Sequence, residues 1–172
     1  MAKLEIINVP DPLLKTISEP IGQVDDDLRR LMDNMLETMY DAPGIGLAAI
    51  QVAIPKRVIV VDAEGDDEVK KPKFLVNPQV TWESEELNVY NEGCLSVPEH
   101  YAEVERPASV KVKYLDYNGK EQEEQMDGLL ATCVQHEIDH LNGIVFIDYL
   151  SRLRRNMIIK KVQKATKDMA VL

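Results

Sequence analysis

The sequence has few of the features that mark secreted, membrane or nucleic-acid-binding proteins. It contains only two cysteines in 172 residues and no secretory signal, which argues against a disulfide framework. No apolar run approaches the roughly 20 residues that a membrane-spanning helix needs. Acidic residues outnumber basic ones by 30 to 20, and a net charge of −10 repels phosphate. We therefore expect a cytoplasmic protein with neither DNA nor a membrane as a partner.

Histidine is also scarce, which makes its distribution informative. Of the three histidines, two lie in the segment 136–140, His-Glu-Ile-Asp-His. Two histidines four residues apart share one face of a helix, so both imidazoles can reach one metal ion. Glu137 between them can face a metal-bound water as a general base. The segment predicts a catalytic metal site.

A metal on such a helix needs at least a third ligand, and the sequence narrows the choice. One class of metalloprotease has a third histidine at the position that Phe146 occupies here. Another class uses a later glutamate, but no glutamate follows Glu137. Cys94, in the motif Glu-Gly-Cys-Leu-Ser, is the better candidate because a thiolate binds Zn²⁺ or Fe²⁺ strongly. The alternative role for this cysteine is that of a small buried hydrophobe.

A closed Cys₂His₂ site that also uses Cys133 conflicts with helix geometry. Cys133 and His140 would be two turns apart, about 10.5 Å along the helix axis. Bonds of about 2.0–2.3 Å cannot join both residues to one ion unless the helix unwinds. Three protein ligands instead leave an open position for water, whose pKa the metal lowers towards about 7. Glu137 can then accept the water proton and deliver it to a leaving amine.

The pattern of apolar residues predicts one α+β domain over residues 1–172. We expect mixed, largely antiparallel sheets around a buried central metal-binding helix, with a C-terminal helix. The expected helices cover residues 25–41, 127–142 and 151–172, and the expected strands cover residues 57–62, 74–76, 109–116 and 120–126. In the last helix, Leu153, Met157, Ile158, Val162 and Ala165 are expected to face inward.

The last predicted helix is basic, whereas the rest of the chain is acidic. From Arg152 to the end there are seven basic residues and one acidic residue. Such a helix is either a contact surface for an anionic partner or a solvated face, and the sequence leaves both open.

The segment 44–51, Gly-Ile-Gly-Leu-Ala-Ala-Ile-Gln, is a loose match to a dinucleotide-binding turn. A true turn of that kind follows a strand and opens a helix, whereas this segment follows the helix that ends near Ala42. A flexible backbone that approaches a ligand closely, with Gln51 as an amide donor, explains the segment better. Taken alone, Gln51 is a polar surface residue.

Together and in this order, segments 44–51, 92–96 and 135–140 resemble the GxGxAAxQ, EGCLS and HExDH motifs of bacterial peptide deformylases of the Gram-negative type. The likeness extends across nearly the whole chain. It implies a metal-dependent hydrolase that removes the N-formyl group from the formyl-methionine of newly synthesised proteins and releases formate. It also implies one Fe²⁺ per chain, for which Zn²⁺, Ni²⁺ or Co²⁺ can substitute, and a monomer.

The resemblance assigns roles to individual residues. Cys94, His136 and His140 bind the metal, and Glu137 is the acid and base. The Gln51 amide and the Leu95 backbone N–H stabilise the oxyanion. The substrate-binding residues that it implies are Ile45 and Gly46, which pair with the substrate backbone, Gly93, and Leu129 and Cys133, which wall a methionine pocket with His136. The basic helix resembles one that docks on ribosomes.

Two other functions remain open at this point. A metallopeptidase could use the same helix, but it would cleave internal peptide bonds and need an extended cleft. A non-catalytic metal-binding module could dock on ribosomes through the basic helix. Gln51 and Glu137 argue against that module, because a structural metal site requires neither residue.

Overall fold

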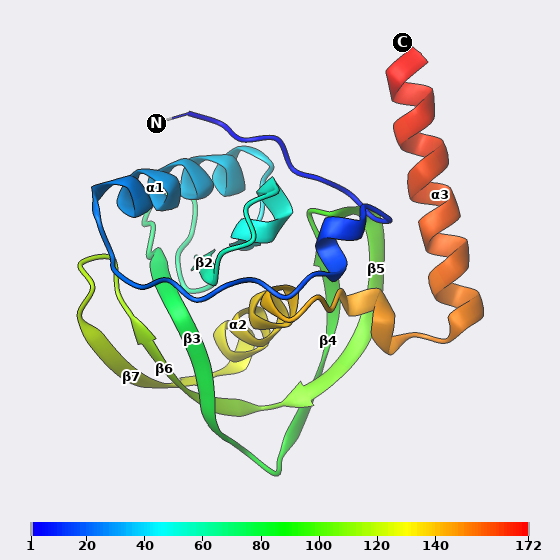
Figure 1. The fold of residues 1–172 in the computed structure, drawn as a ribbon. Helices are drawn as coiled ribbons and strands as arrows, with labels where there is room; N and C mark the ends of the chain where they lie inside the picture. The colour runs from blue at the N-terminus through cyan, green and yellow to red at the C-terminus, as the bar shows by residue number, and fades with distance from the viewer. Residues whose placement is uncertain (1, 172) are drawn as a thin grey trace.

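Two antiparallel sheets flank a central helix, as Figure 1 shows for the computed structural model, which describes residues 2–171. The larger sheet has the strand order β1-β2-β3-β6-β7, and the smaller one pairs β4 with β5. The predicted α+β class is therefore confirmed. The strands are β1 (Gly46–Ala48), β2 (Val58–Val61), β3 (Lys73–Glu83), β4 (Leu87–Cys94), β5 (Val97–Pro107), β6 (Ser109–Leu115) and β7 (Glu121–Asp127). The helices are α1 (Asp26–Asp41), α2 (Gly128–Leu141) and α3 (Arg152–Val171), with 3₁₀ turns η1 (Pro12–Lys15), η2 (Ala49–Val52) and η3 (Phe146–Tyr149).

Helix α1 covers one face of the larger sheet, and α2 covers the other. The Asp25 carboxylate caps α1 by accepting a hydrogen bond from the Leu28 N–H at 2.8 Å. A stripe of methionines on α1 packs against Val58 and Val60 of β2. The alternate β2 residues Ile59 and Val61 pack towards α2. Strand β2 is buried on both faces, which explains its continuous apolar run.

Strand β3 is longer than the sequence pattern predicts. The strand expected at residues 74–76 was to end at Asn77-Pro78, but it runs on to Glu83. The register with β6 shifts between Val76 and Gln79, and such a bulge accommodates a proline without a missing ladder hydrogen bond. Asn77 has a φ of 51°, and its side-chain amide bonds both the N–H and the carbonyl of Ile21 at 2.8 Å. This local contact holds the bulge.

The pair β4 and β5 forms a two-stranded ribbon that the sequence pattern does not predict. Its inward face carries Glu92 and Arg106, which are both buried, so apolar alternation is interrupted by charge. The ribbon turns at residues 94–97 and brings Cys94 next to His140 of α2. This turn carries the third predicted metal ligand to the central helix.

Helix α3 projects from the body beside β5 (Figure 1). It begins after Ser151, whose Oγ accepts a hydrogen bond from the Arg154 N–H at 3.2 Å. Ile158 and Val162 are buried as predicted, but Leu153 and Met157 are 74% and 51% exposed, and Ala165 is also exposed. That part of the prediction is wrong because the helix leaves the body, so only one narrow face finds a partner. Within residues 2–171 no helix combines the length and the apolar character needed to span a membrane.

Candidate metal centre

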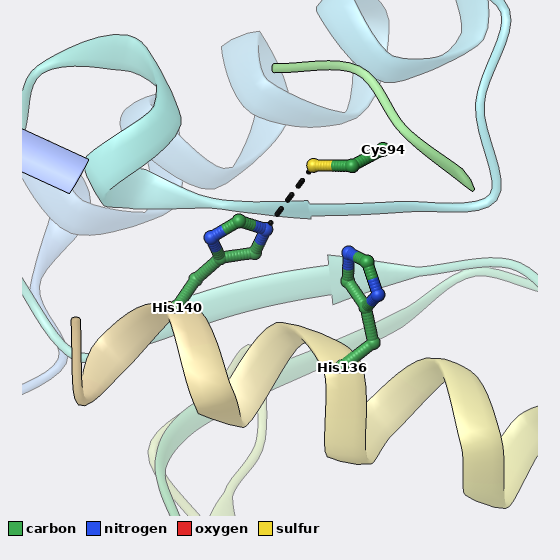
Figure 2. Close-up of side chains that lie close together, drawn as sticks. All are labelled: Cys94, His136 and His140. Carbon is green, nitrogen blue, oxygen red and sulfur yellow. Dashed lines mark hydrogen bonds between the residues drawn. The ribbon is translucent and has the colours of Figure 1, made fainter. Parts of the chain in front are cut away.

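Cys94, His136 and His140 converge between the ribbon and α2. Their potential ligand atoms all lie within 4.8 Å of one another. Figure 2 shows both imidazoles projecting from the same side of α2 towards Cys94, whose Sγ lies 3.3 Å from Nε2 of His140. The structure thus brings the three predicted ligands together, from the end of β4 and from successive turns of α2.

The donor set fits a divalent transition metal. Burial lowers the pKa of His140 well below its usual value, which favours the neutral imidazole that binds metals. One sulfur and two nitrogens within this space are donors typical of Zn²⁺ or Fe²⁺ sites. The residues present therefore suit a metal ion.

Cys133 is not among the ligands. Burial raises the pKa of its thiol well above the usual value, so the group stays protonated. Its Sγ donates instead to the carbonyl of Ile45 at 3.5 Å. The exclusion of a closed Cys₂His₂ site is consistent with this geometry.

A buried ion-pair network holds His136 in place. Oε1 of Glu92 lies 2.9 Å from Nδ1 of His136, which leaves Nε2 of that ring for a metal. Arg106 grips the same carboxylate with two hydrogen bonds, of 2.7 Å from Nε and 2.9 Å from Nη2. Although burial opposes its ionisation, hydrogen bonds from His136 and Arg106 lower the pKa of Glu92. The imidazole is therefore oriented by a carboxylate that is itself fixed.

The network continues along α2 to Asp139. Nη1 of Arg106 donates to Asp139 Oδ2 at 2.8 Å, and the Tyr149 hydroxyl donates to the same oxygen at 2.7 Å. Although burial opposes its charge, hydrogen bonds to Glu92 and Asp139 raise the pKa of Arg106. The guanidinium links the ribbon to the helix that carries both histidines.

Glu137 lies beside the ligands. It is 4% exposed, and its Oε2 lies 4.0 Å from Nε2 of His136. Burial raises the pKa of Glu137 to about 7, and its Oε1 has no hydrogen-bond partner among the described residues. A Cβ at Gly46 would collide with the Glu137 carboxylate, so only glycine lets this backbone approach it.

Gln51 reaches the same space from η2. Its Oε1 accepts from the Ala48 N–H at 2.9 Å, which turns the NH₂ group towards the ligands. That NH₂ lies 3.4 Å from Cys94 Sγ and 3.0 Å from Ser96 Oγ. Gln51 is 1% exposed, so the alternative of a polar surface residue is wrong.

The remaining predicted residues surround this centre. Leu95 follows Cys94 and packs on Gly44, where an added Cβ would lie 2.8 Å from its Cδ1. Gly93 lies under the ring of Tyr101. Ile45, whose carbonyl accepts the hydrogen bond from Cys133, and Leu129 on α2 are 45% and 43% exposed.

Sequence reasoning missed the partners of the ligands. Glu92 and Asp139 are fixed letters of the EGCLS and HExDH motifs, two residues before Cys94 and directly before His140, but the motifs alone assign them no role. Their charge inside segments that pack against the centre is the signal that could have found them, because a buried carboxylate such as Glu92, or a partly buried one such as Asp139, needs a cation. Arg106 carries no local signal, since only the pairing of β4 with β5 brings it to Glu92.

Comparisons with known proteins agree with this geometry. A family model described as polypeptide deformylase matches residues 3–156. A peptide deformylase of Phenylobacterium zucineum is 59% identical over 97% of this chain and 99% of its own length. A crystal structure of peptide deformylase from Ehrlichia chaffeensis superposes with a TM-score of 0.94, at 41% identity and covering 98% of this chain and 99% of that one. Another from the same organism, in complex with actinonin, gives a TM-score of 0.90 at 44% identity over 96% and 98%. The chain therefore belongs to the polypeptide deformylase family.

Proposed function

We propose that Cys94, His136 and His140 hold the metal ion with which this enzyme removes the N-formyl group from nascent formyl-methionyl peptides. The observation that carries this assignment is the convergence of the three ligand atoms within 4.8 Å, with one imidazole fixed by Glu92. A divalent ion bound there supplies Lewis acidity, polarising a carbonyl and lowering the pKa of water towards about 7. From the resemblance to peptide deformylases we expect Fe²⁺. Zn²⁺, Ni²⁺ or Co²⁺ can substitute for it, because all of these ions accept this donor set.

Glu137 moves the proton in this proposal. Its carboxylate lies beside His136, and its Oε1 has no hydrogen-bond partner among the described residues. It takes a proton from the attacking water and delivers it to the amine nitrogen as the C–N bond of the formamide breaks. Formate and a free N-terminal amine are the products.

Gln51 and Leu95 stabilise the oxyanion that forms on the formyl carbon. The Gln51 NH₂ group is already turned towards Cys94, because its oxygen is held by the Ala48 N–H. Donors that are oriented before the reaction cost no reorganisation when charge develops. Leu95 is placed by its neighbour Cys94 and by packing on Gly44.

The substrate backbone pairs with two open strand edges. Strand β1 is the last strand of the larger sheet and β4 has a partner only in β5, so each offers one unpaired edge near the ligands. An extended peptide can add to such edges through main-chain hydrogen bonds. Ile45, Gly46 and Gly93 are the residues that we assign to this pairing.

The methionine side chain enters an apolar site on α2. Leu129 and Cys133 stand on the turns that precede His136, on the face that carries the histidines. Leu129 is partly exposed at the surface and Cys133 is buried beneath it. A site that is open at Leu129 and buried at Cys133 suits a flexible apolar side chain.

Formate release tests the proposal directly. Protein purified without oxygen is incubated with formyl-Met-Ala beside a Glu137→Ala variant that is shown to hold the same metal. We expect release by the first and a loss of about 10²–10⁴-fold in the second. Full activity in the variant would contradict the role of Glu137. No release from protein with one metal per chain would contradict the proposed substrate.

We assign the basic helix α3 to docking on the ribosome. We also expect the enzyme to act as a monomer in the cytoplasm. Support comes from its lysines, which are exposed, and from its projection away from the acidic body. Ribosomal RNA is a polyanion that attracts such a surface in a salt-dependent manner. The exposed Leu153 and Met157 near its start offer apolar contacts beside the charges.

Sedimentation with ribosomes tests this assignment. A charge-reversed variant, Lys160→Glu with Lys164→Glu, is compared with the wild-type protein at increasing salt. We expect the variant to remain in the supernatant at salt concentrations where the wild type sediments. Equal sedimentation of both proteins would contradict the assignment. Gel filtration of the free protein checks the monomer.

A further inference from the structure

A buried threonine on α2 has a hydroxyl that the chain itself does not use. Thr132 is 3% exposed, and its Oγ1 has no hydrogen-bond partner among the described residues. A helical threonine ordinarily bonds back to the carbonyl four residues earlier. Thr38 on α1 does so, donating to the Asn34 carbonyl at 2.7 Å and accepting from the Leu4 N–H at 2.8 Å. The unused hydroxyl of Thr132 is therefore a specific feature of its position.

That position faces the ribbon, in line with His136. Gly128, Thr132 and His136 recur every four residues and share one stripe of the helix. At one end of the stripe, a Cβ on Gly128 would lie 3.9 Å from the Tyr90 hydroxyl of β4. At the other end, His136 is bonded to Glu92, which is two residues after Tyr90 and so on the same face of β4. Thr132 stands between these two contacts.

The same turns of α2 carry the residues assigned to the methionine pocket. Leu129 lies three residues before Thr132 and is 43% exposed, whereas Cys133 follows it and is buried. Thr132 is thus deeper than Leu129 and one turn before the metal ligand His136. Residues three and four apart are neighbours on a helix surface, so a side chain that packs between Leu129 and His136 lies next to Thr132.

We infer that the Thr132 hydroxyl donates a hydrogen bond to the thioether sulfur of the substrate's methionine, and so favours methionine over an all-carbon side chain of equal length. This inference rests on the proposed function. The sulfur is the one hydrogen-bonding atom of that side chain, and it can only accept. A threonine hydroxyl can donate, and here nothing else in the described chain accepts its proton.

Paired substrates test the inference. Formyl-Met-Ala and formyl-norleucyl-Ala differ only in sulfur against methylene. The ratio of their kcat/KM values is measured for the wild type, Thr132→Val, which keeps the shape, and Thr132→Ser, which keeps the hydroxyl. We expect the ratio to fall by about three- to tenfold in Thr132→Val, mainly through KM, and to persist in Thr132→Ser. Thr38→Val makes the same change at a buried helical threonine away from the site and should leave the ratio unchanged.

Binding of the products gives a readout that does not depend on turnover. Calorimetry with Met-Ala and norleucyl-Ala should show the same change in preference. An unchanged ratio in Thr132→Val, or an equal loss of kcat/KM for both peptides, would overturn the role of Thr132. Formate release by the wild type would still uphold the proposed function in that case. No formate from either peptide with metal-loaded wild-type protein would instead overturn the proposed function, and the inference with it.

Discussion

Helices α2 and α3 use charge in opposite ways. Almost every residue of α2 is buried, and two of its titratable side chains, His136 and Asp139, are held by Glu92 and Arg106 of the ribbon. Most of the charged side chains of α3 are exposed to solvent. Burial makes an unpaired charge costly, so the position of each group on α2 is specified. Solvation makes the charges of α3 interchangeable, so what matters there is their number and sign.

Removing a charge should have its largest effect in the network around Arg106, where the buried groups have fixed partners. Arg106→Met leaves the buried carboxylate of Glu92 and the partly buried carboxylate of Asp139 without their cation. Breaking a buried pair in this way destabilises a protein by about 3–5 kcal/mol. Because Glu92 also orients His136, we expect metal affinity to fall by about 10–100-fold. Denaturant unfolding and metal titration measure the two effects.

The matched control for this change is Arg154→Met on α3, whose side chain is exposed. Its effect should stay within about 0.5 kcal/mol, with metal affinity unchanged. Comparable losses in both variants would mean that the buried network has no special role.

The second prediction concerns a neutral group of the site. Gln51→Leu keeps the volume but removes the NH₂ group beside Cys94. We expect kcat to fall by about 10²–10³-fold while the metal is retained, because one oxyanion donor is lost. The control Gln163→Leu alters an exposed amide on α3 and should have no effect on kcat. A Gln51→Leu variant that loses its metal would assign this side chain to holding Cys94 instead.

The two sides of α3 provide the third prediction. Ile158 is 8% exposed and packs in the cluster of β5 and η3, whereas Leu153 is 74% exposed. Ile158→Ala should cost about 2 kcal/mol, and Leu153→Ala should cost less than about 0.5 kcal/mol. Thermal unfolding of both variants measures the difference. Equal effects would mean that α3 does not pack on the body in solution.

The contrast between the helices also explains what the sequence could predict. Helix α1, strand β2 and the hairpin of β6 and β7 follow from local periodicity and a turn signal at Asn118-Gly119. The ribbon of β4 and β5 does not, because its inward face carries the ion pair of Glu92 and Arg106 where apolar residues would reveal the pattern.

The site divides in the same manner. His136, Glu137 and His140 are neighbours in sequence, so helix geometry alone brings them together. Arg106 owes its role to the packing of the ribbon on α2, and no spacing in the sequence encodes that packing. Local motifs thus predict which residues are chemically active, whereas the residues that orient them depend on tertiary structure.

The smallest expected effect is that of the α3 charges on catalysis, and it separates the roles of α2 and α3 most clearly. Reversing the charges of Lys160, Lys164 and Lys167 to glutamate changes the net charge by six, and these side chains are exposed on a helix that projects from the body. At physiological salt, charges separated by more than about 8 Å of solvent are largely screened. We therefore expect kcat/KM for formyl-Met-Ala to stay within about twofold of the wild-type value. Its dependence on salt should be the same in the variant and in the wild type. A larger change would show that the field of α3 reaches the metal centre. An unchanged value would separate catalysis, which depends on the fixed charges around α2, from any attraction to anionic partners, which depends on α3.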